Sequence, residues 1–134
     1  MKVDGQCHCG QLTFEAEIDP NAVRICHCTD CQTMAGTAYR VTVAAPAATF
    51  KIRSGQPKIY VKIAESGNQR AHAFCGNCGA QIYSSALRDP PVYSVRVGTL
   101  KQRRELPTKS QIWFRSALPW VTDLKGLPHV ELQQ

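Results

Sequence analysis

Apolar and polar residues alternate along several short stretches of the chain. The clearest stretch is QLTFEAEI, in which Leu12, Phe14, Ala16 and Ile18 lie on one face and polar or charged residues on the other. A period of two residues is the pattern of a half-buried β-strand. The same reasoning predicts strands in five segments: residues 11–18, 37–43, 58–64, 92–98 and the shorter 110–114.

Helices are expected to be few and short. One candidate covers about residues 29–35, where Thr29 could cap the first turn, and another is TLKQRREL at residues 99–106. The stretch AAPAA at 44–48 is expected to be a loop or an irregular edge. Eight prolines and nine glycines scattered along the chain indicate many turns. Strands separated by turns, with little helix, predict a mainly β fold.

The chain has 134 residues, a length that predicts one domain. Its 43% hydrophobic and 19% charged residues are ordinary for a globular protein. The first ten residues, MKVDGQCHCG, lack the apolar segment of a signal peptide. No apolar run approaches the roughly 20 residues of a membrane span. We therefore expect a cytoplasmic protein with reduced thiols and no membrane partner.

The cysteines change this picture most. There are seven, an odd number that argues against a closed disulfide framework. They occur as C-x-C, C-x-C-x-x-C and C-x-x-C, at the short spacings that metal ligation needs. Two other interpretations are weaker. Inert buried cysteines would not cluster, and a thioredoxin-like C-x-x-C would sit in a βαβ context that is missing here.

In CHC at 7–9, an extended chain would put Cys7 and Cys9 on the same face. In FCGNCG, glycines allow a tight turn that points Cys75 and Cys78 at one spot. The Cys7/Cys9 pair and the Cys75/Cys78 pair can be combined into one four-thiolate site. The three thiols of CHCTDC at 26–31 then remain as a second group. Spacing alone does not fix that pairing.

Five segments, taken in order, resemble the glutathione-dependent formaldehyde-activating enzyme and centromere protein V family. They are GQCHCGQLTFE, CHCTDCQTMAGTA, FCGNCGAQIY, VGTL and IWFRSALPW, and they run from about Gly5 to Trp120. Members are similar in fold to the Mss4-like group, in which small coiled antiparallel sheets surround zinc. The resemblance implies a mainly β, Mss4-like fold with few short helices, in a single zinc-binding domain over residues 1–134 with its core at about 5–120.

By this resemblance, the chain would hold two zinc ions. Cys7, Cys9, Cys75 and Cys78 would bind the structural one. Cys26, Cys28 and Cys31 would bind a second, less securely held zinc and form the catalytic site. Three protein ligands with an open fourth position are the arrangement of catalytic zinc.

The family's named reaction adds glutathione to formaldehyde and gives S-hydroxymethylglutathione, which is formally a carbon–sulfur lyase reaction run in reverse. We therefore expect a zinc-dependent enzyme of carbon–sulfur lyase type that acts on thiol adducts, with a small-molecule thiol such as glutathione as its partner. The alternative is a non-catalytic, zinc-stabilised binding module. Gln32 and Gln111 depart from the family pattern, where Arg and His are common, and they leave the identity of the substrate open.

The four histidines are not expected to complete the second site. His27 lies between two of the thiols, so an extended segment would point it away from the metal. The same holds for His8. His72 would reach a metal site only through a bend before Cys75, and His129 lies in the expected C-terminal tail.

The charge balance argues against a nucleic-acid partner. The formal net charge is +6; seven thiolates subtract seven and two zinc ions add four, which leaves about +3. KQRR at 101–104, with Lys109 and Arg115, is either an anchor for substrate carboxylates or a solvated face. No stripe of basic residues with interleaved aromatics is present. The sequence does not define an oligomeric state.

Overall fold

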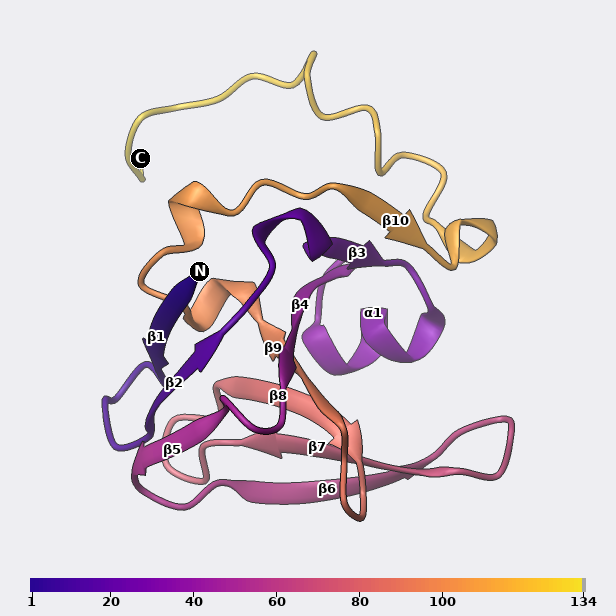
Figure 1. The fold of residues 1–134 in the computed structure, drawn as a ribbon. Helices are drawn as coiled ribbons and strands as arrows, with labels where there is room; N and C mark the ends of the chain where they lie inside the picture. Colours follow the sequence, from indigo (N-terminus) through magenta and orange to yellow (C-terminus); the bar gives the residue numbers. More distant parts are fainter. Residues whose placement is uncertain (134) are drawn as a thin grey trace.

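The computed structural model describes residues 1–133 as a mainly β protein (Figure 1). Its ten strands are β1 (Lys2–Gln6), β2 (Thr13–Glu17), β3 (Arg24–Cys26), β4 (Arg40–Pro46), β5 (Lys51–Ser54), β6 (Lys58–Ile63), β7 (Gln69–Phe74), β8 (Gln81–Ala86), β9 (Val92–Arg96) and β10 (Ser110–Ile112). Within this range there is one α-helix, α1 (Thr29–Ala35), and four 3₁₀ turns, η1 (Pro20–Ala22), η2 (Val97–Thr99), η3 (Arg103–Glu105) and η4 (Phe114–Ser116). None of these helices is long and apolar enough to cross a membrane.

The strands form two sheets. A three-stranded antiparallel sheet has the order β1-β2-β5, and a seven-stranded sheet has the order β10-β3-β4-β9-β8-β7-β6. All neighbours in the larger sheet are antiparallel except β10 and β3, which are parallel. The helix α1 connects β3 to β4 and lies beside them (Figure 1). The Gln81 amide donates to the Met34 carbonyl (2.6 Å) and so ties the end of α1 to β8.

The hydrophobic core lies between the two sheets. The predicted strand at 11–18 is confirmed as β2, and its apolar positions Leu12, Phe14, Ala16 and Ile18 are all buried. Phe14 packs on Phe50, which directly precedes the neighbouring strand β5, with ring centroids 5.5 Å apart. Across the interface, Val43, Val95 and Ile82 of the larger sheet complete the same cluster.

Several predictions fail where tertiary contacts decide the outcome. Ile59, Val61 and Ile63 alternate along β6, but all three side chains are exposed, because β6 is an edge strand with no layer covering this face. Ala44–Pro46, predicted as a loop or an irregular edge, continue β4, which lies inside the sheet between β3 and β9. Pro46 is tolerated because it ends the strand, where no further ladder hydrogen bond is needed from its nitrogen.

The predicted helix at 99–106 consists instead of two 3₁₀ turns, η2 and η3. Contacts with β1 explain the difference. The Gln102 amide donates to Asp4 Oδ1 (2.7 Å), and its carbonyl oxygen accepts from the Asp4 N–H (3.1 Å). Lys101 forms an ion pair with the same carboxylate (2.6 Å). These bonds hold the segment against β1 in a shape that a regular α-helix would not allow.

Candidate metal centres

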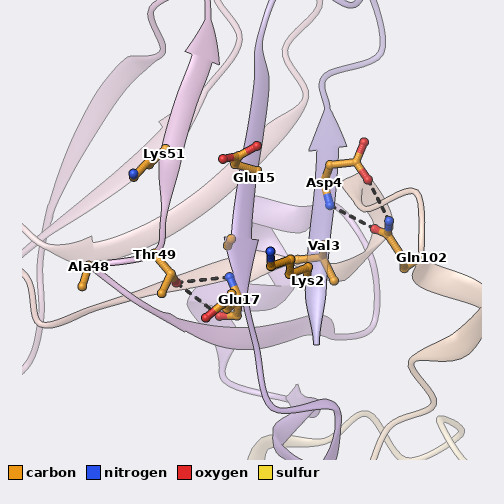
Figure 2. A pocket seen from close by; sticks show the side chains of 10 residues that line it. Lys2, Val3, Asp4, Glu15, Glu17, Ala48, Thr49, Lys51 and Gln102 are labelled. Carbon is orange, nitrogen blue, oxygen red and sulfur yellow. Dashed lines mark hydrogen bonds between the residues drawn. The ribbon is translucent and has the colours of Figure 1, made fainter.

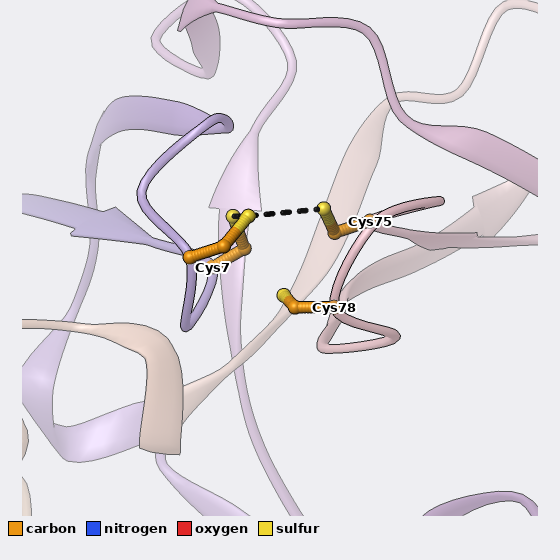
Figure 3. Close-up of side chains that lie close together, drawn as sticks. Cys7, Cys75 and Cys78 are labelled. Atoms are coloured by element: carbon orange, nitrogen blue, oxygen red, sulfur yellow. Dashed lines mark hydrogen bonds between the residues drawn. The ribbon is translucent and has the colours of Figure 1, made fainter.

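Four cysteines from two distant segments meet at one end of the smaller sheet (Figure 3). Cys7 and Cys9 follow β1, and Cys75 and Cys78 lie in the turn between β7 and β8. Their sulfur atoms all lie within 4.8 Å of one another. The Sγ atoms of Cys7 and Cys9 are 3.5 Å apart, and those of Cys9 and Cys75 are 3.7 Å apart.

Two similar turns bring these thiols together. Gly10 and Gly79 both have the left-handed backbone that favours glycine, with φ of 82° and 78°. Each closes a turn by donating its N–H to the carbonyl of a cysteine, Gly10 to Cys7 (3.2 Å) and Gly79 to Cys75 (2.8 Å). Cys7 and Cys9 are therefore held by a turn, and not by the extended chain that we expected.

The four-thiol cluster matches the dimensions of a tetrahedral zinc site. With Zn–S bonds of about 2.3 Å, the sulfur atoms of a tetrahedron lie about 3.8 Å apart, which is close to the two distances observed. N–H groups of Leu12 and Asn77 donate to the sulfurs of Cys7 and Cys75. Hydrogen bonds from the backbone of Ala80 and Cys9 lower the pKa of Cys78 to about 6.

The other three cysteines form a second cluster at the start of α1. Cys26 ends β3, Cys28 caps the helix and Cys31 lies in its first turn, with all three sulfurs within 4.8 Å of one another. The Cys31 N–H donates to the Cys28 sulfur (3.2 Å), so Cys28 is the N-cap in place of the predicted Thr29. Among the residues that the structure describes, no histidine, carboxylate or fourth thiol joins this group.

Cys28 differs from its two partners in exposure and acidity. Cys26 and Cys31 are buried, whereas Cys28 is partly exposed. Burial raises the pKa of the Cys31 thiol well above its usual range, and the hydrogen bond with Cys28 adds to this rise. Burial would also raise the pKa of Cys28, but hydrogen bonds from the Cys31 thiol and backbone outweigh it, so the pKa of Cys28 is lowered.

A cavity of about 510 Å³ opens beside Cys28. Its lining has three cationic side chains, Lys62 of β6, Arg70 of β7 and Arg115 of η4, and two carboxylates, Asp30 and Glu65, so its formal charge is net positive. The Lys62 ammonium pairs with Asp30 (2.6 Å), while the Arg115 guanidinium lies over the Trp113 ring, 5.1 Å from its centroid. Lysine and arginine at the mouth of a cavity suit an anionic ligand.

The basic neighbourhood predicted from the sequence is divided by the fold. Arg115 lines the cavity beside Cys28, but Lys101 pairs with Asp4 elsewhere. A larger cavity, of about 600 Å³, lies on the three-stranded sheet, with Gln102 at its edge (Figure 2). Its lining carries more acidic than basic side chains and holds no cysteine among the described residues. The cavity beside the thiols is therefore the better candidate for a substrate.

His27 is fully buried and does not point at a metal cluster. Its Nε2 lies 2.7 Å from Oε1 of Gln111 in β10. The rings of Tyr39 and Phe114 pack edge-on against the imidazole, with centroids 5.5 and 5.3 Å away. His27 therefore anchors the loop that carries Cys26 and Cys28.

Gln32, the other departure from the family pattern, also contacts the loop around His27. Its amide donates to the His27 carbonyl (2.8 Å) and to the Ser116 carbonyl (3.0 Å). Gln32 and Gln111 therefore both join the cysteine loop to the C-terminal segment. Neither of them lines the cavity beside Cys28.

Three buried basic side chains lie on the face of the larger sheet next to the second cluster: Arg40 of β4, His72 of β7 and Arg96 of β9. Burial, with the positive charges of Arg40 and Arg96, lowers the pKa of His72 to about 4, so it is neutral at pH 7. Burial lowers the pKa of Arg96 to about 9, which leaves it charged. The sequence analysis missed these residues, because a polar residue opposite an apolar face of a strand predicts solvent exposure.

His8 and His129 are exposed, as expected, and His129 lies in the turns of residues 117–133, which contain no described strand or helix. His72 faces Arg96, with Nδ1 3.4 Å from Nη2, and belongs to neither thiol cluster.

Comparisons with known proteins agree with this architecture. A crystal structure of a Rhodobacter sphaeroides protein superposes with a TM-score of 0.63 at 22% sequence identity, covering 81% of this chain and 98% of that one. At this identity the likeness shows the fold alone. A sequence model of the family described as glutathione-dependent formaldehyde-activating enzyme matches residues 2–116, which include all seven cysteines. The chain therefore belongs to the glutathione-dependent formaldehyde-activating enzyme family.

Proposed function

We propose that this protein is a zinc-dependent enzyme of carbon–sulfur lyase type that acts on thiol adducts of aldehydes, such as S-hydroxymethylglutathione formed from glutathione and formaldehyde. One observation carries the proposal. Three clustered thiols have no fourth protein ligand among the described residues, and the partly exposed one, Cys28, opens onto a cavity whose lining is net positive. Membership of the family supports the same reaction.

The two clusters suit different roles. Cys7, Cys9, Cys75 and Cys78 would hold a closed structural zinc that joins the segment after β1 to the β7–β8 turn. Cys26, Cys28 and Cys31 would hold the second zinc with an exchangeable fourth position. When bound there, zinc would supply a Lewis acid that favours the thiolate form of a substrate thiol.

The residues around Cys28 would bind and orient the substrate. Arg70 and Arg115 offer guanidinium groups to the carboxylates of a peptide thiol such as glutathione, whereas Lys62 is already paired with Asp30. In the reaction, the thiolate sulfur forms a bond to the formaldehyde carbon, the carbonyl π bond breaks, and the oxygen takes a proton from water. Positioning the two reactants together is the contribution that the cavity makes. The proposal requires a reducing compartment such as the cytoplasm, because free thiols would otherwise oxidise.

The test compares Cys28→Ser with the wild type and with Thr29→Ser, a neighbouring change that removes no thiol. Zinc is counted by elemental analysis, and exchange between glutathione, formaldehyde and their adduct is followed by NMR. We expect two zinc ions and accelerated exchange in the wild type and in Thr29→Ser. Cys28→Ser should stay folded with about one zinc and no acceleration.

The opposite outcome favours the non-catalytic binding module. If the wild type carries two zinc ions but a protein side chain fills the fourth position and added thiols never displace it, the enzyme proposal fails.

A further inference from the structure

Arg40 and Arg96 form a buried guanidinium pair directly beneath the three-cysteine cluster. Arg40 lies opposite Cys26 in the β3–β4 register, and Arg96 lies opposite Thr42 in the β4–β9 register. Paired residues of neighbouring strands point to the same face, and so do residues two apart along β4. Both arginines therefore share the sheet face of Cys26. Each side chain is only 7% exposed.

No carboxylate neutralises this pair within residues 1–133. The ion pairs found there are Arg53–Glu15, Lys62–Asp30 and Lys101–Asp4. Arg96 donates to the Ser84 hydroxyl (3.3 Å) and the Ser94 carbonyl (3.1 Å), which are neutral acceptors. The Nε and Nη2 atoms of Arg40, and Nε of Arg96, are buried without any hydrogen-bond partner.

A buried charge without a partner is costly, so the pair needs an anion nearby. The candidates on this face are the thiols themselves, because Cys26 faces Arg40 and Cys31 lies in the helix above β4. Three thiolates and one zinc ion would carry a net charge of −1. A neutral fourth ligand leaves that value unchanged. A thiolate brings it to −2, which balances the combined charge of +2 on the two guanidinium groups.

Other charged groups nearby do not alter this balance. Lys62 and Asp30 cancel each other as an ion pair. His72, which touches Arg96, is neutral at pH 7. Arg70 is only partly buried and lines the cavity, where solvent or a substrate carboxylate can neutralise it.

We propose that Arg40 and Arg96 are specificity-determining residues, which make the second site prefer an anionic sulfur ligand over neutral ligands such as water or imidazole. The inference rests on the proposed function, since it assumes a metal held by Cys26, Cys28 and Cys31. It adds the residues responsible for selecting a thiolate at the fourth position.

The test uses the full-length protein loaded with Co²⁺, whose visible spectrum reports each change of ligand. The two probes are 2-mercaptoethanol, which has no carboxylate for the cavity cations to bind, and imidazole. For Arg40→Met we expect the affinity for 2-mercaptoethanol to fall at least tenfold, which is the effect of one charge even at about 12 Å in an effective dielectric of about 20. The affinity for imidazole should not fall. Arg40→Lys should keep the preference for the thiol.

The matched control is Arg53→Met, which removes an exposed guanidinium on β5 and should leave both affinities unchanged. Equal effects of Arg40→Met on the two probes, or none, would overturn the inference. If Arg40→Met does not fold, Arg40→Lys decides, since loss of the thiol preference in that charged variant refutes the electrostatic argument. A wild type that holds two cobalt ions but binds no thiol refutes the proposed function itself.

Discussion

Replacing Gln111 by leucine should destabilise the protein through His27. The imidazole is 0% exposed, and its Nδ1 atom already has no hydrogen-bond partner. The bond between Nε2 and the Gln111 oxygen, at 2.7 Å, is the one polar contact of the ring found in residues 1–133. Leucine removes the acceptor and leaves both ring nitrogens unpaired in the interior.

The magnitude follows from this loss. An unsatisfied buried donor costs about 1–3 kcal/mol, so we expect the free energy of unfolding to fall by about 2 kcal/mol. With about 2.1 cal/mol/K of unfolding entropy per residue, the 134-residue chain has about 0.28 kcal/mol/K. The melting temperature should therefore fall by about 7 °C.

Thermal unfolding of the zinc-loaded variants, followed by circular dichroism, measures this change. Gln111→Glu keeps an acceptor oxygen and should stay close to the wild type, and Gln56→Leu is the control at an exposed glutamine. Because His27 lies between Cys26 and Cys28, Gln111→Leu should also release the second zinc at a lower chelator concentration. A melting temperature within about 1 °C of the wild type, or an equal loss in Gln111→Glu, would refute the reasoning.

Three further predictions test other parts of the structure. Cys75→Ala should unfold or aggregate, because structural zinc binding contributes directly to folding; a soluble, normally folded variant in gel filtration and circular dichroism would contradict the four-thiol site. Burial and the positive charges of Arg40 and Arg96 lower the pKa of His72 from 6.5 to about 4. As pH falls, the unfolded chain therefore binds a proton at His72 before the folded chain does. The free energy of unfolding should decrease by up to about 3 kcal/mol between pH 6.5 and pH 4. His72→Gln lacks this dependence on pH. Chemical denaturation should therefore show that the difference in free energy of unfolding between wild type and variant becomes smaller over that pH range. A constant difference would count against a neutral buried His72. Ile63→Ala should change stability by less than about 0.5 kcal/mol, because Ile63 is 70% exposed, whereas Phe14→Ala should cost about 3–5 kcal/mol; a large effect at Ile63 in the same melts would mean that another molecule covers β6.

Much of the candidate site could be predicted from short-range spacing. Thiols two or three residues apart must lie close together in any compact turn, so the half-sites of Cys7 with Cys9, and Cys75 with Cys78, were visible in the sequence. The alternation around Phe14 likewise identified a strand with one buried face. Such patterns depend only on local backbone geometry, which is why they can be read without a structure.

Strands without alternation escaped prediction. The sequence analysis missed β1, β3, β5, β7 and β8. In β7, for example, Ala71, His72 and Ala73 are buried in succession, because both faces of the strand are covered. A segment buried on both faces has no period of two, so periodicity cannot reveal it.

The tertiary structure alone decided which surfaces are covered and which charges are buried. Along β4 and β6 the same alternation is present, yet Arg40 is buried on the polar face of β4 and Ile63 is exposed on the apolar face of β6. The sequence determined that each segment is a strand with two unlike faces. What lies over each face depends on elements distant in the chain: β4 is central and has α1 beside it, whereas β6 stands at the sheet edge. Burial is a property of that packing, and so the charged layer beneath the three thiols could be found only in the folded molecule.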